Sequence, residues 1–233
     1  MKDEQSCEGD KKIERIDAKY ISHEIQHLLH LDKGFPFTFK EILIRPGKAV
    51  REYLRENREK YVKPIVFLVF SAVLYTFIIH LFHIDVVIFN IKDLGDTQQL
   101  NSDLDISVIN RWIDSHLAYS ALIIGFFMAI WTRIFFYKND YNIFEIFVLL
   151  SYIFGVFFSA LLAFLLISKI TGLLMITQIG IVLLQVYFVG AIGQFFGERK
   201  FLNYFKSLIC LILGVFSYKY SVIFLAYLMH LFK

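Results

Sequence analysis

The chain has 233 residues, of which 57% are hydrophobic and 18% aromatic, with 26 phenylalanines. A water-soluble domain rarely carries such a load, because most of it could not be hidden in one core. The formal net charge is only +3, but 14 of the 24 Lys and Arg residues lie in residues 1–63. This distribution favours attraction to anionic lipid headgroups and argues against a nucleic-acid partner.

The two cysteines exclude several classes of protein. Cys7 lies in the polar N-terminal stretch and Cys210 in an apolar run, so we expect no disulfide between them. Without a Cys-x-x-Cys pair the chain has neither a zinc ribbon nor a two-cysteine redox motif. Residues 1–12 lack the apolar core of a secretory signal, so the first membrane span is expected to direct targeting. We expect no cofactor.

Residues 13–31 have the periodicity of an amphipathic helix, because Ile21, Ile25 and Leu28 recur on one face. The same stretch contains the H-E-x-x-H pattern, with His23 and His27 as potential zinc ligands. No third ligand is evident nearby, and the pattern lies in a polar segment rather than inside a span. A row of histidines at the headgroup level, protonated in part below neutral pH, is the plainer interpretation.

A short apolar stretch at 37–44 follows, which is too short to cross a membrane and predicts an interfacial or re-entrant piece. Pro46 suits the first turn of a new helix, which we expect to end near Lys63 because Pro64 follows. One side of this helix is apolar and the other basic. It predicts a lipid- or partner-binding region, or simply an anchor for the first span, with the candidate residues Arg45, Lys48, Arg51, Tyr53, Arg55 and Arg58.

Residues 30–61 carry a series of short motifs: D-K-G-F at 32–35, Thr38, Lys40, R-P-G-K at 45–48 and R-E-Y at 51–53. In this series the segment resembles an uncharacterised bacterial membrane family, the domain of unknown function 3667. The resemblance implies a membrane location but no established activity. Members often carry a zinc ribbon ahead of the motif; only Cys7 stands there, so we expect a truncated form without it. A Gly-x-Arg usually follows R-E-Y, and its replacement at 56–58 speaks against a tight turn there.

Five long apolar runs dominate the rest of the chain. A helix rises about 1.5 Å per residue, so roughly 20 apolar residues cross the hydrocarbon core of about 30 Å. Each run reaches this length with few charges, which predicts five spans at 64–84, 115–137, 143–167, 173–196 and 207–232.

Lys and Arg alternate between the two sides of these spans. Residues 48–63 carry six, the loop 85–114 two against six aspartates, 133–138 two, 168–172 one and 199–206 three. By the positive-inside rule the N-terminus is expected in the cytoplasm, and the acidic loop and the C-terminus outside. We expect the bacterial inner membrane.

Polar side chains within the spans are costly in lipid and suggest function. Lys219 lies near the middle of the last run, and Gln178 and Gln185 share one face of the fourth. The amides are expected mainly to join helices, but together with Lys219 they are the best candidates for a polar cavity. A helix break at 217–221, as in transporters, is the less favoured alternative.

The sequence thus predicts an all-α integral membrane protein: a five-helix transmembrane bundle, 64–233, preceded by an amphipathic, basic cytoplasmic or interfacial region, 1–63. The favoured function is a non-catalytic scaffold or accessory subunit that binds anionic headgroups or a membrane-protein partner, including a second copy of itself. The alternatives are a transporter of a small solute or lipid-linked substrate through the cavity at Lys219, and, third, a zinc metallopeptidase using His23 and His27.

Overall fold

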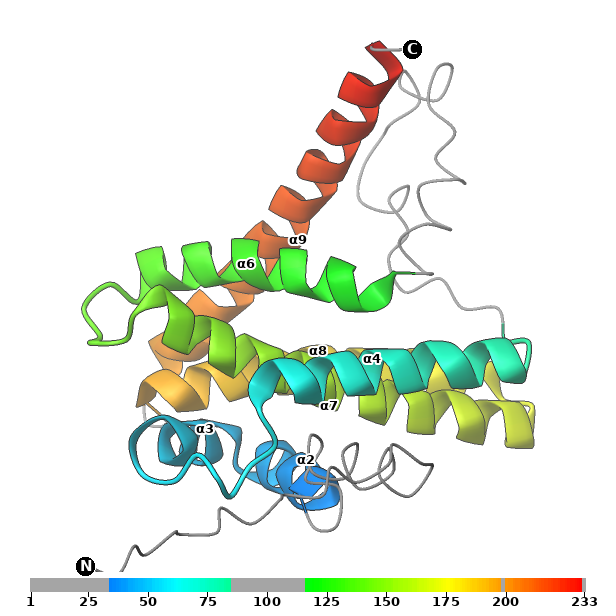
Figure 1. Cartoon of the computed structure of the whole chain (residues 1–233), viewed down its shortest axis with the longest axis horizontal. Coiled ribbons are helices and arrows are strands. Elements are labelled where there is room, and N and C mark those ends of the chain that lie inside the picture. Colours follow the sequence, from blue (N-terminus) through cyan, green and yellow to red (C-terminus); the bar gives the residue numbers. More distant parts are fainter. Residues whose placement is uncertain (1–33, 85–115, 198–199, 232–233) are drawn as a thin grey trace, which may run out of the picture.

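The structure is a computed structural model that describes residues 34–84, 116–197 and 200–231 (Figure 1). All regular elements in these residues are α-helices. They are α2 (Gly34–Ile44), α3 (Pro46–Arg55), α4 (Pro64–Leu81), α6 (Leu117–Phe135), α7 (Ile143–Thr171), α8 (Leu174–Gly197) and α9 (Phe201–Leu231). The last five are long and apolar enough to cross a membrane, as the sequence predicts. The molecule is therefore an all-α integral membrane protein.

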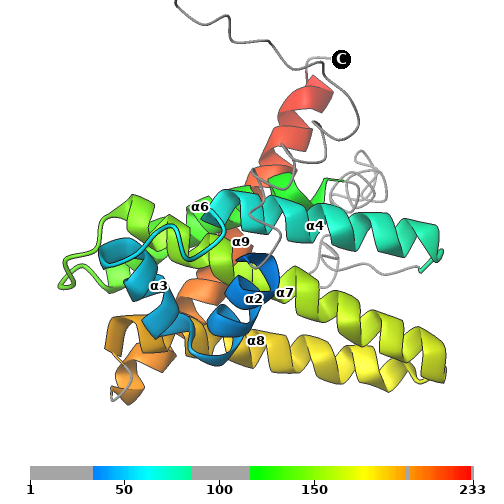
Figure 2. The same ribbon diagram turned by 60° about the horizontal axis from the view of Figure 1, so that its bottom comes forward.

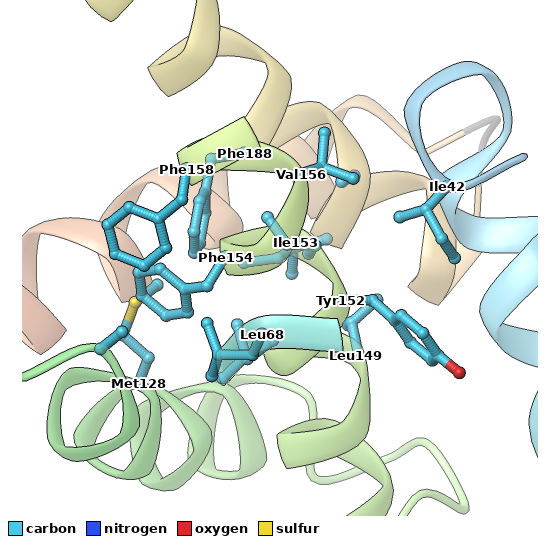
Figure 3. Close-up of a cluster of buried hydrophobic side chains, with 14 of the residues drawn as sticks. Ile42, Leu68, Met128, Leu149, Tyr152, Ile153, Phe154, Val156, Phe158 and Phe188 are labelled. Carbon is cyan, nitrogen blue, oxygen red and sulfur yellow. The ribbon is translucent and has the colours of Figure 1, made fainter. Parts of the chain in front are cut away.

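Helix α7 is the centre of the bundle. It packs against α4, α6 and α8, while α9 packs against α6 and α8 (Figures 1 and 2). Side chains from several helices meet around α7: Phe154 and Phe158 lie close to Leu68 of α4, Met128 of α6 and Phe188 of α8 (Figure 3). Because lipid is as apolar as these side chains, close van der Waals packing holds the helices together.

Helices α2 and α3 pack on one side of the bundle, against α7 and α8 (Figure 2). Ile42 of α2 is fully buried, and its carbonyl accepts a hydrogen bond of 2.8 Å from the hydroxyl of Tyr187 in α8. The apolar stretch predicted to be interfacial or re-entrant is therefore a short helix seated on two spans.

All five spans have one terminus near α3. There α4, α7 and α9 begin and α6 and α8 end (Figure 1). We call this the basic end, because the sequence places Lys and Arg mainly in these connections. At the opposite end, the Lys169 ammonium donates to the Phe82 carbonyl and joins α7 to α4. The described connections that carry Lys138 and Lys200 thus lie together at the basic end of the bundle.

The boundary of α3 differs from the prediction. The helix ends at Arg55 and not near Lys63. The Asn57 side chain accepts hydrogen bonds from the backbone N–H groups of Glu59 and Lys60, at 3.0 and 3.2 Å. An asparagine that bonds to its neighbouring backbone competes with helix formation and makes a turn. The absence of a glycine at 56–58 spoke against a tight turn at this point. A turn is nevertheless present, and the Asn57 side chain organises it.

The last span also differs from its prediction, because α9 starts at Phe201, six residues before 207. It is continuous through the region considered for a break, where the Ser221 hydroxyl donates to the Ser217 carbonyl at 2.8 Å as part of a helical turn. The C-terminal half of α9 projects from the bundle in both views (Figures 1 and 2). The predicted amphipathic segment 13–31 and the acidic loop 85–114 lie outside the described residues.

Candidate functional site

Helix α3 lies directly against the backbone of α8. Pro46 occupies the first turn, where its missing N–H costs nothing, and Gly47 follows. A Cβ atom on Gly47 would lie 2.6 Å from the carbonyl carbon of Gln194 and 2.8 Å from the nitrogen of Phe195. Only glycine permits this approach. The R-P-G-K motif therefore starts a helix and sets its contact with α8.

The same contact satisfies the C-terminus of α8. The last carbonyls of a helix lack partners within it. Arg51 donates to the carbonyls of Gln194 and Phe195 at 2.8 and 2.9 Å, and Asn203 donates to those of Phe196 and Gly197 at 3.1 and 3.3 Å. The positive guanidinium also suits the negative end of the helix dipole. Arg51 is thus part of the structure that holds α3 on the bundle.

A cluster of tyrosines fixes the chain between α3 and α4. Tyr53 packs edge-on against Tyr152 and Tyr61, with ring centroids 5.4 and 6.3 Å apart. The Tyr152 hydroxyl donates to the Val62 carbonyl at 2.7 Å. Burial raises the pKa of both Tyr53 and Tyr61 above the ordinary tyrosine value, so both phenols remain neutral. Tyr53 therefore belongs to the internal packing of this end.

Between α3, the α6–α7 connection and the start of α9 lies a cleft of about 650 Å³, which we call the basic cleft. Four cations line it, Arg51, Arg55, Lys138 and Lys200, against one carboxylate, that of Asp140. Its remaining lining residues are Asn139, Tyr141, Phe195, Phe196 and Gly197. The side chains of Arg55, Lys138 and Lys200 are exposed, so their charges are available to a ligand.

Three aromatic side chains, Tyr141, Phe195 and Phe196, line the basic cleft, and Phe136 packs against them. Phe136 stacks on Phe196 with ring centroids 4.0 Å apart and planes 13° from parallel, and Tyr141 packs on Phe195 at 4.4 Å. The Arg55 guanidinium lies 5.3 Å above the centroid of the Tyr141 ring, within the range of a cation–π interaction. The cleft therefore combines aromatic side chains with exposed positive charges.

A second cavity of about 460 Å³ adjoins the basic cleft and shares Lys138, Asn139 and Lys200 with it. Its own cation is Lys206, whose ammonium donates to the Phe135 carbonyl at 3.2 Å and lies 5.6 Å above the Phe136 ring. Sequence reasoning treated these three lysines only as charges that orient the spans. All three lie at span ends on the side where the sequence places α3. This shared side could have indicated that they belong to the same site as the cations of α3.

The structure separates the predicted N-terminal site residues into groups. Arg51 and Arg55 line the basic cleft. Arg45 forms an ion pair with Glu41, whose hydrogen bond raises the pKa of the guanidinium above its ordinary value. Lys48 and Arg58 are exposed and do not line either cavity.

The predicted polar-cavity residues have different surroundings in the bundle. Lys219 of α9 is buried, with 3% of its surface exposed. Gln185 lines a small, mostly apolar cavity of about 110 Å³ between α6, α7, α8 and α9, whose lining includes neither Gln178 nor Lys219. Gln178 is exposed on α8.

The predicted zinc ligands His23 and His27 lie outside the described residues. Within the parts of the chain that the structure describes, no group of three His, Cys, Asp or Glu side chains is close enough to hold a metal ion.

These features define a five-span membrane protein with a basic helix docked at the ends of its spans. The model of the family described as "Protein of unknown function (DUF3667)" matches residues 32–76, which run from just before α2 into α4. The predicted resemblance is confirmed for this segment, which contains Gly47, Arg51 and Tyr53. The comparisons with curated proteins and with solved structures gave no match.

Proposed function

We propose that the protein is a non-catalytic membrane accessory protein that binds phosphate-bearing anionic lipid headgroups in the basic cleft. The observation that carries this proposal is the convergence of four cations from three separate segments on one cleft at the ends of the spans. Basic pockets between span ends are suited to such headgroups, and each Lys or Arg near an anionic surface contributes about 1 kcal/mol of attraction.

The chemistry of the cleft supports an anionic ligand. Because Asp140 is the only acidic residue in its lining, the cleft keeps an excess of positive charge. Arg51 is oriented by the α8 carbonyls, whereas Arg55, Lys138 and Lys200 can turn toward a phosphate. Lys and Arg are the usual phosphate-binding side chains, Lys as a compact charge and Arg as a planar donor.

The proposal includes an orientation and a location. The basic end would face the cytoplasm of a bacterial inner membrane, because cytoplasmic connections carry the excess of Lys and Arg. It would then meet the leaflet surface whose anionic lipids attract basic segments.

The test uses the purified full chain in a mild non-ionic detergent. Added phosphatidylglycerol is expected to raise its melting temperature more than equal amounts of phosphatidylcholine, since a ligand that binds only the folded state stabilises it. The Arg55→Ala and Lys200→Ala variants should lose most of this difference. The matched controls Lys48→Ala and Arg58→Ala remove the same charge outside the cleft and should retain it.

Two results would overturn the proposal. One is an equal effect of both lipids on the wild-type protein. The other is an acidic protein that co-purifies with the wild type, is lost from Arg55→Ala and Lys200→Ala, and accounts for the whole effect of these variants. In that case the cleft would be a docking site for a protein.

A second function is favoured by one specific observation, the burial of Lys219 in the middle of α9. A charged side chain at this depth often marks a transport path. If the protein is a transporter, Lys219→Met should fail to complement a deletion phenotype that Arg55→Ala complements. If the protein acts through the basic cleft, Arg55→Ala should fail to complement the deletion and Lys219→Met should complement it.

A further inference from the structure

We infer that the basic cleft and the cavity beside it together hold one lipid headgroup that carries two phosphate groups. This inference rests on the proposed function and narrows its ligand from any anionic headgroup to a diphosphate one. The probe with this chemistry is cardiolipin, in which two phosphates are joined by a glycerol bridge.

The two cavities are adjacent and similarly equipped. Each has a cation of its own, Arg55 in the basic cleft and Lys206 in the second cavity. Lys138 and Lys200 line both, so they stand between the two phosphate positions. The stacked rings of Phe196 and Phe136 belong to the first and second lining respectively, which places the cavities on either side of one ring pair.

The charge balance favours two phosphates over one. Across both cavities Arg55, Lys138, Lys200 and Lys206 oppose the single carboxylate of Asp140, in addition to Arg51 on the α8 carbonyls. A single phosphodiester carries one negative charge and would leave most of this excess uncompensated. Two phosphates, one in each cavity, would each have a cation of their own and share the two lysines of the common rim.

The surroundings of the second cavity point to a lipid as the carrier of the phosphates. Phe201 and Leu202 line this cavity and are 85% and 61% exposed, and Tyr137, also in its lining, is 64% exposed. They adjoin the apolar outer surfaces of α6 and α9, two helices long and apolar enough to cross a membrane. Acyl chains can extend along these side chains while the headgroup enters the cavities, an arrangement that a soluble diphosphate would not use.

The experiment is native mass spectrometry of the intact chain, titrated separately with cardiolipin, phosphatidylglycerol, phosphatidylcholine and inorganic pyrophosphate. Cardiolipin is expected to bind at least tenfold more tightly than phosphatidylglycerol. Lys138→Ala, which removes a shared cation, should abolish most of this preference. Lys206→Gln should reduce cardiolipin binding to the level of phosphatidylglycerol binding and should affect phosphatidylglycerol binding less.

The controls are again Lys48→Ala and Arg58→Ala, which should keep the cardiolipin preference. Because Lys206 also caps α6, its variant is interpreted only beside Lys138→Ala, whose native side chain is exposed.

The outcomes separate this inference from the proposed function. Equal affinity for cardiolipin and phosphatidylglycerol, both above phosphatidylcholine, would overturn the two-phosphate inference and leave the proposed function standing. No preference for either anionic lipid would overturn both. Pyrophosphate binding as tight as that of cardiolipin would overturn the lipid assignment. A loss in Lys48→Ala equal to that in Lys138→Ala would show general surface attraction and overturn the site.

Discussion

Val62 is held at both of its backbone polar groups by side chains from two different helices. Its N–H donates to the Thr38 hydroxyl of α2 at 3.0 Å, and its carbonyl accepts from the Tyr152 hydroxyl of α7 at 2.7 Å. Thr38 is fully buried, so water cannot replace it as acceptor. Val62, two residues before α4 begins, is thus connected to the short helix and to the centre of the bundle.

Replacing Thr38 with valine tests this connection. Valine has nearly the same shape but no acceptor, so the buried N–H of Val62 loses its partner, at a cost of about 1–3 kcal/mol. We expect Thr38→Val to lower the free energy of unfolding by this amount, measured by titration with sodium dodecyl sulfate in mixed micelles. Thr38→Ser keeps the hydroxyl and should lose less. Equal losses for the two variants would mean that packing, and not the hydrogen bond, is what matters.

Arg51 gives a second prediction at this scale. Its guanidinium donates to two carbonyls at the end of α8, and hydrogen bonds to charged groups contribute about 1.5–3 kcal/mol. Arg51→Ala should therefore destabilise the protein by an amount in this range in the same titration. Arg58→Ala, an exposed arginine of the same segment, should leave stability nearly unchanged. If Arg51→Ala had no larger effect than Arg58→Ala, the proposed capping role would be refuted.

For single residues, the sequence predicted which side chains form the basic region better than it predicted the groups that they contact. It grouped Arg51 with exposed cations as binding residues, because helical periodicity separates a basic from an apolar face. Periodicity does not reveal which backbone carbonyls or rings meet that face. The contacts of Arg51 are 143 and 144 residues away along the chain, and such distant contacts leave no trace in local spacing.

At the scale of the helices, the docking of α3 on α8 depends on the absence of a side chain at Gly47. At Gly47 an added Cβ would meet backbone atoms of α8, which cannot turn aside as a flexible side chain can. At Gly190, in α8 itself, nothing in the described part of the chain beyond the adjacent helical backbone lies within 4 Å of such a Cβ. The chain thus offers a crowded and an open helical glycine for direct comparison.

We predict that Gly47→Ala destabilises the protein by about 1–3 kcal/mol, because α3 must move away from α8 to admit the methyl group. Gly190→Ala should be neutral or stabilising by up to about 1 kcal/mol, since alanine is the better helix former. Melting temperatures in detergent compare the two variants. A Gly47→Ala protein as stable as the wild type would show that the close approach of α3 is not needed. In the Gly47→Ala variant, the rise in melting temperature caused by phosphatidylglycerol should also be smaller, because α3 supplies Arg55 to the basic cleft.

The number and type of the spans followed from hydropathy, because only a helix satisfies its own backbone in hydrocarbon. Their ends followed less well. Helix α9 begins six residues before the predicted span, since the polar positions Asn203 and Lys206 face helix ends and do not interrupt the helix. Helix α3 ends early because of one asparagine side chain. Boundaries depend on such single contacts, which a hydropathy average does not record.

In the whole molecule, basic residues from alternate connections come together on a single surface. The segments that carry Arg55, Lys138 and Lys200 are far apart in sequence, and the five antiparallel crossings bring them to one end. The positive-inside count predicted that these residues share a side. It could not predict that they line one cleft, because that depends on how α3 and α8 pack.

The side of the membrane that the basic end faces decides which leaflet can fill the cleft. In a Cys7→Ser background, Arg58→Cys reports on the basic end and Thr171→Cys on the opposite end. The native side chains at both positions are exposed. Cys210 is fully buried and should stay unlabelled. In intact cells a charged, impermeant maleimide should label Thr171→Cys, whereas Arg58→Cys should react only after lysis. The reverse pattern would place the basic end outside the cell, and the cytoplasmic leaflet could then not supply its lipid.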